Sequence, residues 1–198
     1  MSSSPAARGM GTQMEEQKPL AVAIIGAGPL GRWLALRAAR AGLRVMLEDV
    51  MPSNLHHARE YIRQELNQEG MRLAGGNVGF VSTIEDAVRE AELAIDCVPD
   101  ELESKLEAMW LLDRMSPPKT VFATPTLNMS IEDLANCTYR PDRCIAIVGA
   151  PRKMAELEGQ ENVVIELRTA AATSPETVAL VSGFWQQLGF KTSVAREC

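Results

Sequence analysis

The sequence contains no run of about eighteen apolar residues, the length that a membrane-spanning helix needs. Its longest candidate, Leu20 to Leu30, is interrupted by two glycines and a proline. The first eighteen residues are small and polar and lack the hydrophobic middle of a secretory signal, so we expect 1–18 to form a disordered leader. These absences predict a cytoplasmic protein that does not insert into a membrane.

Clustered basic side chains are also missing. The chain has 20 Lys and Arg against 26 Asp and Glu, a net charge of −6. A surface that binds nucleic acid needs a stripe of positive charge to displace counterions from phosphates. The composition therefore argues against a nucleic-acid partner.

Paired cysteine motifs are absent as well. The four cysteines show no C-x-x-C spacing, and no group of His, Cys and carboxylate residues has the spacing of a metal site. Three of the cysteines fall in or beside expected core elements, which favours buried thiols over a metal or disulfide role. They are Cys97, Cys137, Cys144 and Cys198.

What is present is an alternation of short apolar runs with longer helical stretches, typical of parallel strands joined by crossover helices. The 198 residues and 46% apolar content fit a single globular domain, which we place at 19–198. We expect a doubly wound α/β domain, a Rossmann fold with a mostly parallel sheet. Expected strands are 20–25, 43–48, 78–81, 93–98, 120–124, 144–148, 162–167 and 191–194; expected helices are 29–41, 52–69, 84–90, 100–115, 130–136 and one capped by Ser174. The third helix begins at a capping box formed by Ser82 and Glu85.

A glycine-rich turn joins the first strand to the first helix. Gly26, Gly28 and Gly31 match G-x-G-x-x-G, the pattern that lets a diphosphate approach the start of a helix. The amides of Leu30 and Gly31 remain free to donate to a diphosphate, whereas Pro29 has no amide hydrogen. The turn predicts a dinucleotide site; the alternative is a turn that is only structural.

Asp49, at the tip of the second strand, bears on the choice of dinucleotide. It follows Gly26 by 23 residues, where a carboxylate can accept hydrogen bonds from the adenosine ribose. The same carboxylate repels a 2′-phosphate, and the next residues, 50–54, supply no Lys or Arg. We therefore expect NAD as the cofactor rather than NADP.

Five segments, in order, resemble the NAD-binding (N-terminal) domain of the L-3-hydroxyacyl-CoA dehydrogenase family. They are IIGAGPLGRWLALRAARAGLRVMLED, DCVPDELESK, VFATPTLNMSIEDLANCT, RPDRCIAIVGAPR and VIELRTAAATSPETVALVSGFWQQLGF. The resemblance covers residues 20 to about 194. It implies that Asp100 and Lys105 contact the nicotinamide ribose. The alternative is an ordinary charge pair on the solvated face of a helix start.

The resemblance also exposes departures in the catalytic residues. In the family a His held by a Glu takes the proton of the substrate hydroxyl, but Val148 stands at the His position and Leu127 at a substrate-holding serine. The resemblance implies that Glu166 corresponds to the Glu that holds this His. The alternative, equally well supported, is that Glu166 is an ordinary charged residue at the end of a strand. The chain stops at Cys198, where the family's helical C-terminal domain would begin.

Three functions remain open at this point. The leading expectation is an NAD(H)-binding protein without the usual acid–base group, serving as a sensor or partner subunit. The second is an active dehydrogenase for a 3-hydroxyacyl-CoA or a hydroxy acid, completed by another chain or by self-association into a homo-oligomer. The third is an interaction module with a vestigial nucleotide site, which Pro29 favours.

Overall fold

The computed structural model describes residues 18–68, 78–149 and 163–197. Apart from Lys18, the expected leader lies outside the described residues, as does most of the polar stretch after Val148. No helix in the described ranges is long and apolar enough to cross a membrane.

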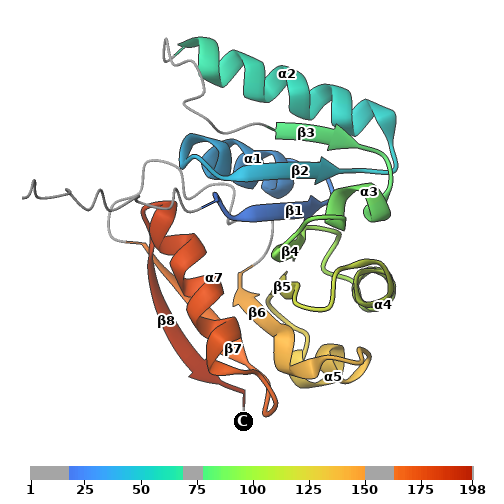
Figure 1. Ribbon diagram of the computed structural model, residues 1–198, viewed down its shortest axis with the longest axis vertical. Helices are drawn as coiled ribbons and strands as arrows, with labels where there is room; N and C mark the ends of the chain where they lie inside the picture. Colours follow the sequence, from blue (N-terminus) through green and yellow to red (C-terminus); the bar gives the residue numbers. More distant parts are fainter. Residues whose placement is uncertain (1–17, 69–77, 150–162, 198) are drawn as a thin grey trace, which may run out of the picture.

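One sheet of eight strands runs through the part of the chain that the structure describes (Figure 1). The strand order is β3 (Val78–Val81), β2 (Arg44–Glu48), β1 (Ala21–Ile25), β4 (Leu93–Asp96), β5 (Val121–Thr126), β6 (Cys144–Val148), β7 (Val164–Thr169) and β8 (Lys191–Arg196). Every neighbouring pair is parallel except β6 with β7. The doubly wound, mostly parallel fold is therefore confirmed.

Helices cover both faces of the sheet. α1 (Pro29–Arg40), α2 (Pro52–Gln68) and α7 (Pro175–Gln187) pack on one core, and α3 (Ile84–Val88), α4 (Leu102–Met115) and α5 (Ile131–Asn136) on the other. A short 3₁₀ turn, η1 (Pro141–Arg143), precedes β6. Since both faces are covered, the central strands β1 and β4 are buried along their whole length, which is why they are nearly continuous apolar runs, interrupted by Asp96 at the end of β4.

The connections from β1 and from β4 leave the sheet in opposite directions, because β1 pairs with β2 on one side and β4 pairs with β5 on the other. In open α/β sheets, ligands bind in the crevice at this reversal, outside the carboxyl ends of the strands. The glycine turn after β1 and Asp49 after β2 lie at that edge.

Two local expectations are wrong. The cap of α3 is Thr83, whose hydroxyl accepts from the Asp86 amide at 3.2 Å, and not Ser82 with Glu85. Adjacent hydroxyls compete for this role, and the extended backbone at Thr83 (φ −135°) decides it.

Cys137 is exposed at the end of α5, whereas Cys97 and Cys144 are buried as expected.

Candidate functional site

The three glycines of the turn do different things. A Cβ at Gly31 would lie 1.8 Å from the Gly26 oxygen, and Gly26 itself has a φ of +99°. Both positions need glycine for the fold alone. At Gly28 a Cβ would meet no atom within 4 Å, and the backbone there is extended with a φ of −64°. Packing therefore gives no reason for glycine at position 28.

Within the described residues, no N-cap side chain caps the start of α1. The first amides of any helix have no partner within the helix, and Gly28, the N-cap residue, supplies no side chain to cap them. Pro29 at the first position has no amide hydrogen to satisfy. The amides of Leu30 and Gly31 are the donors that the helix dipole would present to an anion.

Asp49 is fixed in place by the turn it faces. One carboxylate oxygen accepts from the Ala27 amide at 2.8 Å and the other from the Met51 amide at 2.8 Å. The Asn54 side chain donates to both oxygens at 3.2 and 3.1 Å. The carboxylate thus ties the end of β2 to the glycine turn, and it still borders the cavity described next.

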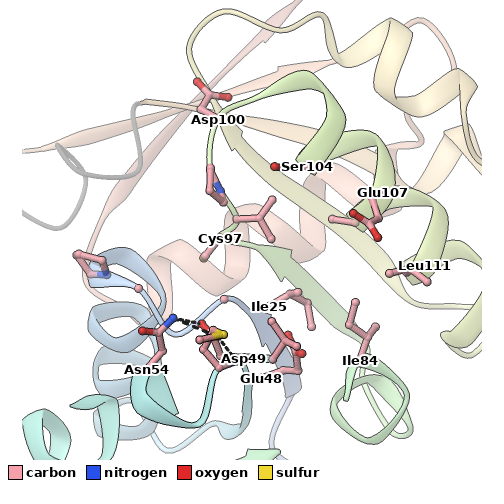
Figure 2. Close-up of a pocket in the computed structure, with 18 residues that line it drawn as sticks. Ile25, Glu48, Asp49, Asn54, Ile84, Cys97, Asp100, Ser104, Glu107 and Leu111 are labelled. Atoms are coloured by element: carbon pink, nitrogen blue, oxygen red, sulfur yellow. Dashed lines mark hydrogen bonds between the residues drawn. The ribbon is translucent and has the colours of Figure 1, made fainter. Parts of the chain in front are cut away.

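A cavity of about 910 Å³ opens at the carboxyl ends of β1, β2 and β4 (Figure 2). This volume lies in the usual range for small-molecule sites. Its lining combines apolar residues with four carboxylates and no Lys, Arg or His; the acidic residues are Glu48, Asp49, Asp100 and Glu107. Gly26, Gly28 and Pro29 of the turn also line it.

Glu48 is a cavity residue that the sequence analysis missed. It is only 6% exposed, and burial, with a smaller contribution from Asp49, raises the pKa of its carboxyl to about 7. The signal was available: an acidic residue directly before Asp49 interrupts an otherwise apolar strand end. Figure 2 shows Glu48 and Asp49 at one end of the cavity and Asp100 at the other.

Asp100 and Lys105 do not share one solvated helix face. Asp100 lines the cavity, and its carboxylate accepts from the Leu127 amide at 3.1 Å. Lys105 is fully buried and its Nζ lies 3.1 Å from an oxygen of Asp96, to which the Thr124 hydroxyl also donates at 2.8 Å. The interpretation as an exposed Asp100–Lys105 pair is therefore wrong, because Lys105 joins α4 to β4 inside the protein.

Comparison with known proteins identifies the domain. The family model for the 3-hydroxyacyl-CoA dehydrogenase NAD binding domain matches residues 21–198. The chain belongs to this family. The family model describes an NAD binding domain, so NAD is the cofactor of the domain. The family resemblance found in the sequence is confirmed.

Relatives of this NAD-binding domain are longer proteins. A 5-formyl-3-hydroxy-2-methylpyridine 4-carboxylate 5-dehydrogenase of Mesorhizobium japonicum is 28% identical, with 89% of this chain and 57% of the relative covered. A probable 3-hydroxybutyryl-CoA dehydrogenase of Bacillus subtilis is 27% identical, with 87% of this chain and 61% of the relative covered. The chain thus spans about three fifths of the length of these relatives.

Solved structures of the family show the same fold. The crystal structure of the NAD⁺-dependent 5-formyl-3-hydroxy-2-methylpyridine 4-carboxylic acid 5-dehydrogenase matches with a TM-score of 0.77 at 27% identity, with 90% of this chain and 59% of that chain covered. A 3-hydroxyacyl-CoA dehydrogenase from Archaeoglobus fulgidus matches with a TM-score of 0.71 at 26% identity, with 89% of this chain and 56% of that chain covered.

The residues of this NAD-binding domain fit a dinucleotide. Gly28, Pro29 at the start of α1 and Asp49 all line one cavity. Amide donors at the start of α1 suit the diphosphate, the Asp49 carboxylate suits the hydroxyls of a ribose, and the apolar side chains of the cavity suit a base.

β6 and β7 hold Val148 and Glu166, two of the positions that the family resemblance singled out. β6 ends at Val148, which pairs with Thr126 of β5. Ile147 lies opposite Leu167 in the antiparallel pairing of β6 with β7, so the next residues in that register are Val148 and Glu166. Glu166 is partly exposed and bonded to Arg168 at 3.2 Å. The described end of β6 therefore places the aliphatic side chain of Val148 next to the Glu166 carboxylate.

Proposed function

We propose that this domain binds NAD(H) and does not itself supply the group that accepts the substrate's hydroxyl proton. The observation that carries the binding is the vacant space at Gly28 beside the uncapped start of α1. The amides of Leu30 and Gly31 would hold the diphosphate, and Asp49 the adenosine ribose. NAD supplies a hydride acceptor when bound; Val148 offers no base next to it.

Asp49 can serve the ribose without losing its place. Its two amide contacts, from Ala27 and Met51, are short at 2.8 Å, whereas both contacts from Asn54 are longer at 3.1 and 3.2 Å. Sugar hydroxyls would therefore replace the Asn54 amide and leave the backbone contacts intact. Asp100, at the other end of the cavity, would serve the second ribose; Lys105 would support that region from inside the protein.

A domain that binds NAD(H) without the acid–base group would act as a sensor or as a partner subunit. A second candidate is an active dehydrogenase completed by another chain or by a second copy of this one. Glu166 favours it, because this carboxylate remains beside the position of the missing base. This candidate would form NADH from a 3-hydroxyacyl-CoA or a hydroxy acid. No absorbance change at 340 nm with such substrates, alone and with candidate partners, would exclude it.

Titration calorimetry with NADH tests the proposed binding. We expect heat of binding for the native protein and a loss of affinity of about tenfold or more for Asp49→Ala, the effect of removing a charged hydrogen-bond acceptor. Serine 53, exposed at the start of α2, gives a neighbouring control as Ser53→Ala. Absence of binding at millimolar NADH, or an Asp49→Ala variant with native affinity, would favour the interaction module with a vestigial site.

A further inference from the structure

Glu48 is the least exposed of the four acidic residues that line the cavity. Glu48 is the last residue of β2, and its side chain lies on the same face of the sheet as the core that contains Met46, Ile84 and Leu106. Only 6% of the residue is exposed, yet it lines the cavity together with Ile25, Ile84 and Leu111. A carboxyl among these apolar groups has no evident structural use.

The described residues give Glu48 no stabilising charge. Asp49, its neighbour, and Glu107, on α4, are the acidic groups that share this part of the cavity lining, and no Lys, Arg or His is among the lining residues. A buried carboxyl in such surroundings is costly unless a ligand donates to it. Burial and Asp49 raise its pKa to about 7, so above that pH the carboxyl is mostly ionised and accepts hydrogen bonds.

We propose that Glu48 selects the base of the bound dinucleotide by hydrogen bonding to the exocyclic amino group of adenine. This inference rests on the proposed binding of NAD(H), because Asp49 at the adenosine ribose would place the base in the adjoining part of the cavity. The apolar side chains of Ile84 and Leu111 suit the faces of a flat ring, and the carboxyl suits an amino edge. A base with a carbonyl oxygen in place of the amino group would place a second hydrogen-bond acceptor against the carboxylate, and no hydrogen bond could form between them.

Nicotinamide hypoxanthine dinucleotide tests this at about pH 8.5, where a carboxyl with a pKa of about 7 is ionised. In this analogue an oxygen replaces the exocyclic amino group and ring N1 carries a hydrogen, so the group proposed to face Glu48 changes from donor to acceptor. With both dinucleotides in reduced form, we expect the native protein to bind NADH about tenfold more tightly, as one hydrogen bond to a charged or partly charged group allows. In Glu48→Leu the ratio falls to about one through weaker binding of NADH. In Glu48→Gln it also falls, because an amide can donate to the oxygen as readily as it accepts from the amino group.

Glu103→Gln is the matched control. Glu103 is an exposed carboxylate of α4 outside the cavity lining, so its variant should keep the native ratio. A native protein that binds both dinucleotides equally overturns the role of Glu48 and leaves the NAD site standing. A native ratio that persists in Glu48→Gln or Glu48→Leu does the same. Failure of the native protein to bind either dinucleotide overturns both the proposed function and this inference.

Discussion

At the scale of single residues, Gly28 and Gly31 separate the needs of the ligand from the needs of the fold. Gly31→Ala places a methyl group 1.8 Å from the Gly26 oxygen, so the turn must move; we expect a loss of about 3 kcal/mol or more in the free energy of unfolding. Gly28→Ala meets no atom within 4 Å and keeps an ordinary φ, so we expect stability within about 0.5 kcal/mol of native.

The same pair of variants differs in nucleotide binding. The methyl group of Gly28→Ala occupies the space through which a diphosphate would approach the amides of Leu30 and Gly31, so affinity for NADH should fall at least about tenfold in a protein that is still fully folded. Urea unfolding and calorimetry on each variant measure the two effects. Native NADH affinity in Gly28→Ala would show that the glycine at this position does not serve the cofactor.

Glu48 also makes a prediction about pH. Its pKa in the folded protein, about 7, lies above its ordinary value of 4.5, so the folded state holds the proton more tightly than the unfolded chain. The contribution to stability is complete below about pH 4.5 and is lost as the pH rises through 7. Glu48→Gln removes this dependence.

We therefore expect the melting temperature of Glu48→Gln, relative to native, to rise by about 5–10 °C between pH 5 and pH 8, because the shift in pKa corresponds to about 2.5 kcal/mol over this range. Scanning calorimetry without nucleotide at the two pH values measures it, with Glu103→Gln as the variant of equal charge change. A difference between Glu48→Gln and native that stays constant with pH would mean that the Glu48 carboxyl does not titrate in this range.

At the scale of elements, a buried ion pair joins β4 to α4. Lys105 and Asp96 are both fully buried, 3.1 Å apart, and Thr124 of β5 donates to the same carboxylate. Lys105→Met leaves Asp96 without its charge partner, which should cost about 3–5 kcal/mol. Adding Asp96→Asn removes the unpaired charge, so the double variant should recover much of that loss.

The two outcomes of Lys105→Met also decide between two roles. A large loss of stability that Asp96→Asn repairs marks a structural pair. A variant of native stability with weakened NADH binding would instead favour the contact with the nicotinamide ribose that the family resemblance implies. Denaturant unfolding and NADH titration of the single and double variants distinguish them.

The order of elements could be predicted because strands buried on both faces are nearly continuous apolar runs, as in β1 and β4. Gly26, Gly31 and Asp49 could be found because a tight turn and a strand end restrict residue type at fixed spacing. The burial of Lys105 could not be predicted, because a charged residue in the first turn of a helix is normally expected to face solvent. Its partner Asp96 lies nine residues earlier on a strand, and only the packing of α4 on β4 brings them together.

At the scale of the whole molecule, charge and architecture act on the same ligand. The sheet places the ends of β1, β2 and β4 at one edge, and there the helix start of α1 offers its positive end while the adjoining cavity carries four carboxylates. The net charge of −6 adds a general repulsion of anions. In the proposed mode of binding, a dinucleotide would depend on the few amides at α1, with little tolerance for further phosphate.

This balance predicts discrimination between NADH and NADPH. The 2′-phosphate of NADPH would meet Asp49 and find no cationic side chain among the residues that line the cavity. At 100 times its dissociation constant, NADH should stabilise the protein by about 2.7 kcal/mol. For a chain of this size that corresponds to a rise of about 5–10 °C in melting temperature.

NADPH at the same concentration should give no shift in melting temperature at low salt. Because screening weakens repulsion, a shift with NADPH that appears only at high salt would support the electrostatic cause, and equal shifts with both at low salt would refute it.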